Sequence, residues 1–473
     1  MKGLAAFAVA LTAILLSACS GVKGLQEPYV HHFDDFSKID YVDSLCLADL
    51  EWWKFYSDST LCAILEKVVY NNRDLLKSEA RIEQLRQLYG ISKTNLLPEI
   101  GYEASTEYET TDFGGKGAST SPTYKLTIPV SWEINLWGSQ IWARREAEAE
   151  YHATEEDSRA LKMELIAQTA EAYYTLMALE NELSIVRRTM ETREESVRIA
   201  KLRYEGGLTS EMLYNQTLVE YSSAAALVPA LEQKMYATRN KLNLLMGEVP
   251  QDIYNIGRFP STFVGPEQLP AGMPSDLLKR RPDIRAAEQR LKAAKANVGV
   301  TYAERFPSFN ISFLPGLEND ALSKFLKSPY QDFVGSLAGP LIDFGRRKKK
   351  YKAAIAAYEE ARLDYEDVVL KAFTEVNTIL HTYYHVQESF KRTKELREET
   401  AEYMQLAQLQ FRAGMINYID VLDAQRSYFD AQIAFSNAIR DQYIALVNIY
   451  KALGGGWRHN PKIPHYSDNF EQD

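Results

Sequence analysis

An internal duplication constrains the fold of this 473-residue chain more than any other feature of its sequence. Residues 73–101 align with residues 282–310 at an offset of 209, and the segments that follow align at an offset of 207. Ordered matches join Asp74 with Asp283, Glu79 with Glu288, Arg81 with Arg290, Gly90 with Gly299, Pro98 with Pro307, Gly138 with Gly345, Tyr204 with Phe411 and Gly207 with Gly414. Such a repeat predicts two copies of one unit: helix, strand, loop, strand, long helix, glycine turn and helix.

Two segments of the first copy alternate with the period of a β-strand. In residues 102–110 tyrosine, alanine and threonine share one face, with glutamate and serine on the other; residues 124–134 alternate similarly despite Pro129. Strands of about ten residues suit a membrane barrel whose apolar face meets lipid. The second copy alternates over 308–313, but 331–342 carries two glycines and a proline, so the sequence pattern predicts the strand there less clearly.

Four strands do not close a membrane barrel, because the smallest such barrels have about eight. Beyond residues 1–18 no apolar run is long enough for a transmembrane helix, so a membrane-spanning form of the chain requires a closed barrel. We therefore expect several chains to assemble into one barrel. The strands alone do not determine how many chains take part. A soluble antiparallel sheet with one wet face is the alternative.

Long helices are predicted between the strands and the glycine turns. Residues 139–205 contain no proline or glycine and are rich in good helix formers. A helix of about 67 residues is about 100 Å long. Its leucines and valine step by 3, 4 and 3 at Leu176, Leu179, Leu183 and Val186, which indicates coiled-coil packing.

The first nineteen residues have the pattern of a lipoprotein signal. Lys2 precedes an apolar stretch too short to span a bilayer, and residues 1–18 therefore read as a signal peptide. Leu-Ser-Ala-Cys at 16–19 resembles the bacterial lipobox, which predicts an N-acyl diacylglycerol lipid on Cys19. Ser20, where aspartate would favour retention in the inner membrane, favours the outer membrane. Cys46 and Cys62 leave open a disulfide or two free thiols.

Composition and motifs argue against catalysis. A net charge of −10 makes nucleic acid an unlikely partner. The sequence contains no phosphate loop, nucleophile elbow or zinc-hydrolase motif, so we expect no enzyme, catalytic residue or cofactor. His381 and His385 have helical spacing but no third ligand nearby, so no metal site is expected. The basic run 346–350 opens a helix and suits either lipid phosphate or solvent.

The motifs together resemble the outer-membrane factors of multidrug pumps, the TolC-like lipoprotein branch of the NodT or OprM type. The resemblance covers nearly the whole mature chain. It rests on the segments at 53–61, 277–288, 339–346 and 411–414, and on WEINLWG at 132–138, VLDAQR at 421–426 and YKALGGGW at 450–457. Asn135 departs from the aspartate usual in the family, and we expect a lost salt bridge at that helix–strand junction without lost function.

The resemblance implies an α+β membrane protein. Three chains would form a β-barrel with four strands each, continued by a long α-helical coiled-coil barrel and surrounded by a mixed equatorial collar. The expected segments are a signal peptide, an anchor and equatorial segment, two repeats and a tail: 1–18, 19–65, 66–270, 271–453 and 454–473. Barrel strands are expected within 99–134 and 307–342, and long helices within 139–246 and 346–453.

The implied function is a passive outer-membrane duct of a tripartite efflux pump that exports small molecules from the periplasm. Its implied partners are a periplasmic adaptor, an inner-membrane pump, outer-membrane lipid and two further copies of the chain. A duct for type I protein secretion is the alternative within the same architecture, and a structural lipoprotein without a pore is a more distant one. The substrate is not encoded here, because the pump selects it.

By resemblance, the aperture at the periplasmic end is assigned to Asp420, Asp423 and Arg426, just after the second glycine turn. Asp420 and Asp423 share one helix face, and Asp423 has Arg426 one turn on. Three copies would place six carboxylates around an opening and favour cations. Ordinary solvated acids at a helix N-terminus are the alternative. Adaptor contact is expected at the two turns, which contain Gly206, Gly207, Leu208, Gly414 and Met415.

Overall fold

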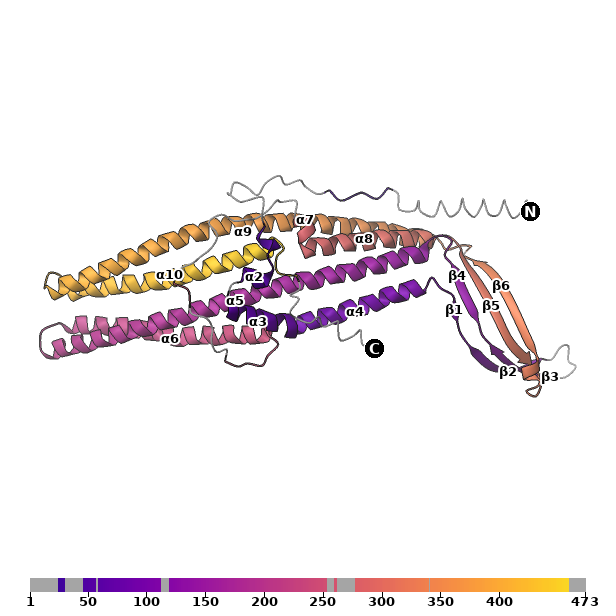
Figure 1. Ribbon diagram of the computed structural model, residues 1–473, viewed down its shortest axis with the longest axis horizontal. Helices are drawn as coiled ribbons and strands as arrows, with labels where there is room; N and C mark the ends of the chain where they lie inside the picture. The colour runs from indigo at the N-terminus through magenta and orange to yellow at the C-terminus, as the bar shows by residue number, and fades with distance from the viewer. Residues whose placement is uncertain are drawn as a thin grey trace. The chain divides into compact units, whose positions relative to one another are not determined.

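A computed structural model describes residues 24–29, 46–56, 58–111, 119–252, 259–261, 277–339 and 341–458. The predicted signal peptide, Cys19 and most of the predicted C-terminal tail lie outside these residues. The helices are η2 (Leu47–Asp49), α2 (Trp52–Phe55), α3 (Ser59–Asn71), α4 (Arg73–Thr94), α5 (Ser139–Glu205), α6 (Glu211–Leu245), α7 (Leu277–Arg280), α8 (Pro282–Ala303), η4 (Phe325–Lys327), α9 (Arg346–Arg412) and α10 (Tyr418–Ala452) (Figure 1). The strands are β1 (Glu99–Ile100), β2 (Glu103–Thr111), β3 (Ser119–Thr127), β4 (Val130–Ile134), β5 (Ser308–Asn319) and β6 (Pro329–Ala338).

The helices show the duplication in their lengths. Helices α4 and α8 each have 22 residues, α5 and α9 each have 67, and α6 and α10 each have 35. The bounds of α5 are those predicted from its lack of proline and glycine. The compact units do not coincide with the repeats, because unit 1 (1–30, 81–155 and 285–368) and unit 2 (the remainder) each draw on both copies.

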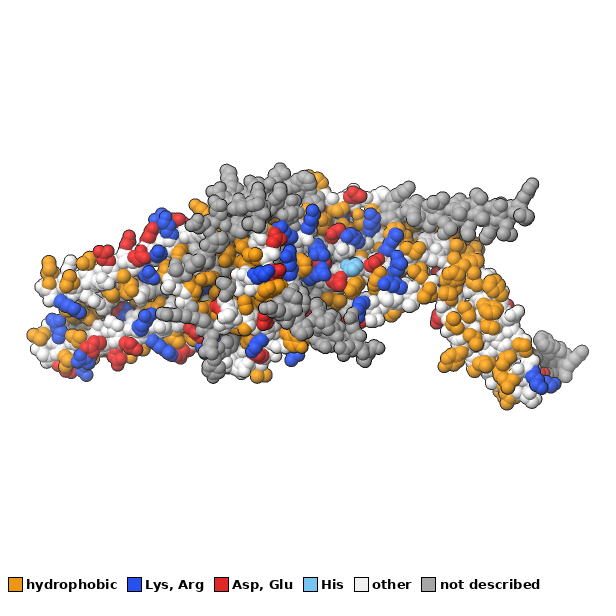
Figure 2. Space-filling view, in the orientation of Figure 1, with side chains coloured by type: hydrophobic (Ala, Val, Ile, Leu, Met, Phe, Trp, Pro, Cys, Tyr) orange, Lys and Arg blue, Asp and Glu red, His pale blue; other side chains and the backbone are white. Residues whose placement is uncertain are grey.

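Unit 1 contains one antiparallel sheet. Strand β5 lies between β6 on one side and β3 with β4 on the other, and β2 and β1 pair with β3 and β4 respectively. The register puts Phe309, Ile311 and Phe313 opposite Ile134, Trp132 and Val130, so apolar side chains share one face. Hydrophobic side chains gather over these strands in Figure 2. The alternation predicted from the sequence is therefore present.

Both strands of the second copy are present, although their sequence pattern is weaker than that of the first copy. Strands β5 and β6 run unbroken for 12 and 10 residues, whereas the first copy is interrupted between β3 and β4. Pro129 lies in this gap and lacks the N–H that a continuous ladder requires. Its carbonyl still accepts the N–H of Gly101 at 2.9 Å. Gly335 does not interrupt β6, since it pairs with Ile311, but β6 ends at Ala338 rather than at 342.

The start of each long helix is capped by a side chain. Asn135 accepts the backbone N–H of Gln140 at 3.1 Å, and Asp343 accepts those of Gly345 and Arg347 at 2.9 and 3.2 Å. These acceptors satisfy N–H groups that the helices themselves leave unpaired. The asparagine at 135 thus provides a cap of its own. Among the described residues no helix combines the length and apolarity needed to cross a membrane.

The core of unit 2 lies along α5, α6 and α10. The predicted stripe Leu176, Leu179, Leu183 and Val186 is buried and packs with residues that include Leu231, Leu242 and Phe429. Narrow stripes of this kind bury little area per turn, so a long run of them is needed for stability.

A cluster of short elements packs on the end of α10 in unit 2. Tyr450 donates to the carbonyl of Leu50 at 2.6 Å and stacks on Phe55 at 4.1 Å. Buried Arg281 binds Asp283, Glu375 and the carbonyl of Ala452. Cys46 and Cys62 are both free thiols, so of the disulfide and the two free thiols that the sequence left open, the structure has the free thiols.

Candidate functional site

The two glycine turns at the ends of the hairpins have the same backbone geometry. Gly207 and Gly414 adopt φ of 73° and 74°, a region that side-chain-bearing residues rarely enter. The next residue in each turn closes the helix end: Leu208 N–H donates to the Arg203 carbonyl at 2.8 Å, and Met415 N–H to that of Gln410 at 2.9 Å. Both turns are therefore Schellman caps. The predicted turn residues Gly206, Leu208 and Met415 lie in them.

Each hairpin tip carries exposed apolar side chains. Leu208 is 74% exposed and Met415, its equivalent at the offset of 207, is 73% exposed. Sequence reasoning singled out these two but missed their exposed neighbours, which also correspond pairwise: Ile199 with Leu406, Leu202 with Leu409 and Met212 with Ile419. The repeat offset is the signal that could have found them. Exposed apolar side chains that gather in one place are typical of protein interaction surfaces.

The three predicted aperture residues lie in the first turns of α10 and are exposed. Asp420 accepts the backbone N–H of Asn417 at 3.0 Å, so its carboxylate helps to cap the helix. Asp423 and Arg426 form the predicted pair, at 2.6 Å, with side chains 49% and 58% exposed. The structure thus brings Asp423 and Arg426 together and gives Asp420 a separate structural contact. A surface pair of this kind contributes little to stability by itself.

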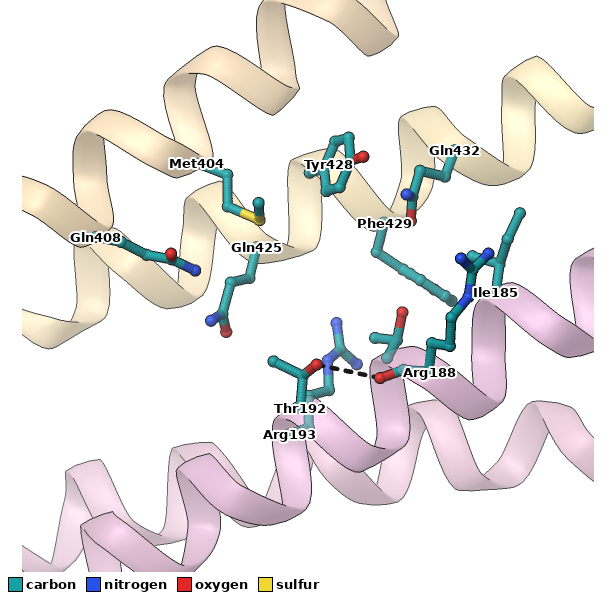
Figure 3. A pocket seen from close by; sticks show the side chains of 11 residues that line it. Ile185, Arg188, Thr192, Arg193, Met404, Gln408, Gln425, Tyr428, Phe429 and Gln432 are labelled. Atoms are coloured by element: carbon teal, nitrogen blue, oxygen red, sulfur yellow. Dashed lines mark hydrogen bonds between the residues drawn. The ribbon is translucent and has the colours of Figure 1, made fainter. Parts of the chain in front are cut away.

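A cavity of about 300 Å³ lies beside this turn, between α5 and the α9–α10 hairpin (Figure 3). Gln425, adjacent to Arg426, extends into it from α10, and its Oε1 is buried without a hydrogen-bond partner. Thr192 and Arg193 line the cavity from α5, and Met404 and Gln408 from α9. An under-packed seam forfeits contacts that a filled core would make, so it resists small shifts of α10 less strongly.

Arg193 is a buried cation that the sequence did not reveal. Its guanidinium donates to the Glu220 carbonyl at 2.5 Å, lies 3.1 Å from the Glu220 carboxylate, and is 5.2 Å from the Phe429 ring. Burial lowers the pKa of Arg193, and the charge of Glu220 opposes this effect. A lone arginine within a long polar helix ordinarily faces solvent, so no sequence pattern marked it.

His381 and His385 are both exposed on α9. Among the described residues, no three side chains of histidine, cysteine, aspartate or glutamate are grouped so that they could hold a metal ion. Cys19, the predicted lipidation site, lies outside the described residues.

The chain is similar to known outer-membrane proteins along most of its length. A model of the family described as outer membrane efflux protein matches residues 64–248 and 273–455. The probable efflux pump outer membrane protein SepC of Pseudomonas putida is 30% identical over 433 residues, covering 89% of this chain and 88% of SepC. Outer membrane protein OprJ of Pseudomonas aeruginosa is 29% identical over 466 residues, covering 96% of each chain.

Comparison with a solved structure leads to the same family. The MtrE outer membrane channel of Neisseria gonorrhoeae, in its open state, has a TM-score of 0.84 at 26% identity, covering 92% of this chain and 97% of MtrE. The long paired helices, the small antiparallel sheet and the glycine-turn hairpins are thus those of a TolC-like channel. The chain therefore belongs to the outer membrane efflux protein family: it is a passive efflux channel of the outer membrane and not an enzyme.

Proposed function

We propose that three copies of the chain form the exit duct of a tripartite, RND-type efflux pump, anchored by an acylated Cys19. The observation that carries the assembly is the sheet of unit 1. One edge is β6 and the other is formed by β1 and β2, and neither edge pairs with a further described strand. Free edges are a template for pairing with another chain, and closure into a ring removes them. Segments β1 and β2 occupy one strand position and β3 and β4 another, so each sheet supplies four strands and three sheets would give a closed twelve-stranded barrel.

The polar face of the sheet suits the water-filled side of such a barrel. Among the described side chains it carries seven carboxylates against one lysine: Glu99, Glu103, Glu107, Glu109, Glu133, Glu318 and Asp332, with Lys125. Charges of one sign lining a narrow duct raise the local concentration of counter-ions. A trimer would therefore favour cations or neutral compounds along the barrel.

The hairpin tips are the proposed contact for a periplasmic adaptor, which in turn would connect the duct to an inner-membrane pump. Support comes from the pairs of exposed apolar residues at both turns, with Leu208 and Met415 the most exposed. The two tips of one chain present similar surfaces, so one adaptor surface could engage both. The name of SepC, as part of an efflux pump, supports the same assembly.

Asp420, Asp423 and Arg426 are the proposed aperture. The Asp423–Arg426 pair would hold the positions of neighbouring carboxylates, and the seam beside Gln425 would let α10 move when the pair breaks. Six carboxylates in a trimer repel one another, so partial neutralisation by Arg426 favours the narrow state. Opening then requires loss of weak exposed pairs rather than of core contacts.

Single-channel conductance in planar bilayers tests the aperture. We expect Arg426→Gln to raise the conductance, because it removes the ion pair and leaves the repulsion between carboxylates unopposed, and Asp423→Asn to lower the preference for cations. Asp420→Asn keeps an oxygen for the helix cap and so reports the effect of charge alone. Glu195→Gln is the matched control, since Glu195 and Arg198 form a similarly exposed pair on α5. Conductance and selectivity equal to wild type in all three aperture variants would refute the assignment.

A further inference from the structure

The start of α9 carries a dense group of cations. Arg347 donates to the carbonyl of Phe306 at 3.2 Å, and Lys350 pairs with Glu304 at 2.5 Å. The other four are exposed, and their side chains form no hydrogen bond or ion pair with any described residue: Arg346, Lys348, Lys349 and Lys352. We call these four the junction cations. They repel one another, and those in the first turn also oppose the helix dipole.

The first copy of the repeat shows that the fold does not require three of these cations. At the offset of 207, Arg346, Lys348 and Lys349 correspond to Ser139, Ile141 and Trp142 of α5, which begins at the equivalent point, whereas Lys352 corresponds to Arg145. The two helices have the same length, so the positive charge adds nothing that the helix itself needs. An anionic partner from outside the chain would offset the repulsion.

Exposed apolar side chains immediately precede the junction cations. Leu341 is 99% exposed, Ile342 71% and Phe344 93%, and Phe344 has a positive φ of 50°. A large apolar residue held in this backbone region and fully uncovered is unfavourable in water. Apolar side chains next to lysine and arginine form the pattern of a membrane interface, where the former meet acyl chains and the latter meet phosphate.

The length of the sheet places this segment at the edge of the bilayer. On β5 the apolar face runs from Phe309 to Leu317, which is about 26 Å at the rise of a strand. An apolar band of about 25 Å matches the hydrocarbon thickness that outer-membrane barrels present. Phe309 pairs with Leu337, close to the end of β6. The segment that follows β6 therefore lies beyond the hydrocarbon, at the level of the head groups.

The N-terminal segment, residues 24–29, gives separate support for this level in the membrane, because its contacts with α9 do not involve the junction cations. Leu25 packs on the cluster that contains Ala354 and Tyr358. Tyr358 donates to the carbonyl of Gln26 at 2.7 Å, and the N–H of Tyr29 donates to Glu366 at 2.6 Å. The segment thus runs parallel to α9, and its N-terminal direction leads toward the start of that helix.

The remaining distance is one that the chain can span. Tyr358 and Arg346 are about 18 Å apart along the axis of α9. Seven residues separate Gln26 from Cys19, and a chain of that length reaches at most about 25 Å. A lipid on Cys19, which is part of the proposed function, could therefore enter the bilayer beside the junction cations.

We propose that the junction cations, with Leu341, Ile342 and Phe344, bind the head groups of anionic phospholipids in the periplasmic leaflet of the outer membrane. The cations contact lipid phosphates and the apolar residues insert among the acyl chains. The site fixes the depth of each subunit at the point where the sheet passes into the long helices. It is independent of the exported compound and of the aperture.

Lipid binding to the full-length, detergent-purified protein tests this proposal. Native mass spectrometry would count bound phosphatidylglycerol and phosphatidylcholine as each is titrated. We expect wild type to prefer phosphatidylglycerol. Each cation near an anionic surface contributes about fivefold to the affinity. The variant R346Q/K348Q/K349Q/K352Q, which removes four, should therefore bind phosphatidylglycerol at least tenfold more weakly, and its binding of phosphatidylcholine should be unchanged. Inorganic phosphate should not compete, because it lacks acyl chains.

A matched control neutralises four exposed lysines of unit 2 whose side chains form no bond with another described residue, K201Q/K241Q/K391Q/K394Q. It changes the net charge equally and should keep the lipid preference of wild type. If the junction variant fails to assemble, K348Q/K349Q carries the same test with a smaller expected loss.

Two results would overturn the proposal. One is equal phosphatidylglycerol affinity in wild type and the junction variants. The other is a change in ion selectivity in phosphatidylcholine bilayers without a change in lipid binding, which would place the cations in the duct. A channel that conducts normally but shows no lipid preference would refute this site alone and leave the proposed function intact.

Discussion

Gly299 provides a direct test of how tightly α8 packs on α5. A Cβ at this position would lie 2.3 Å from Cδ2 and 2.6 Å from Cγ of Trp142. Ordinary contacts of a Cβ begin at 3.4 Å, so Gly299→Ala would require the indole ring to move by about 1 Å or more. The guanidinium of Arg145 lies over the same ring at 4.6 Å and hinders such a movement.

The expected magnitude follows from two opposing effects. Overpacking of a well-filled site costs about 1–3 kcal/mol. Alanine in place of glycine inside a helix stabilises by about 1 kcal/mol. Gly299→Ala should therefore lower the free energy of unfolding by up to about 2 kcal/mol. At Gly90, its equivalent in the repeat, a Cβ would meet no atom within 4 Å, so Gly90→Ala should gain about 1 kcal/mol.

Thermal unfolding of the purified protein, followed by the helical circular dichroism signal, measures both effects. We expect the midpoint of Gly299→Ala to fall below wild type and that of Gly90→Ala to rise above it. In a Trp142→Ala background the methyl group has no ring to meet, so Gly299→Ala should become stabilising. Equal midpoints for the two glycine variants in the native background would refute the packing argument.

Two further predictions concern unit 2. Burial lowers the pKa of Lys162 to about 8, opposed by the charge of Glu79, so folding favours its neutral form. Stability should rise as the pH increases from about 8 toward the unfolded pKa of about 10.4, and Lys162→Met should raise the midpoint at pH 7 but not at pH 10.5. Gly207→Ala and Gly414→Ala force a side chain into the left-handed region at a cost of about 1–2 kcal/mol. Hydrogen exchange should accelerate at the altered tip only; unchanged exchange there would contradict the cap geometry.

The helical part of the fold was predictable because its signals are local and repeated. The absence of proline and glycine over 139–205 gave the bounds of α5, and the glycines at 207 and 414 gave both turns. The strands were less predictable. A proline such as Pro129 lacks the N–H group that a strand ladder needs, whatever its partner strand. Gly335 is tolerated because β5 pairs regularly with β6. The sequence does not show which strand is the partner of β6.

The site was predictable to the extent that its contacts lie within one helix turn. The Asp423–Arg426 pair follows from spacing on α10. Asp420 caps the start of α10, and it is also proposed to charge the aperture. Its spacing in the sequence fits both roles and does not distinguish them. The buried Arg193 and the cavity beside Gln425 depend on how α5 packs against α9 and α10, which no local pattern encodes.

The two copies of the repeat differ in the charged residues that carry the proposed sites. At the positions equivalent to Asp420, Asp423 and Arg426, the first copy has Leu213, Gln216 and Val219. The charged residues of both proposed sites, the aperture and the lipid junction, thus belong mainly to the second copy, although the two copies share helix lengths and turns. A ring of three such chains would have six similar helical hairpins, of which only alternate ones would carry the charges of the aperture and of the lipid junction. The other three would keep a contact tip at Leu208 and the first-copy carboxylates of the barrel, so the two copies would supply different parts of one duct.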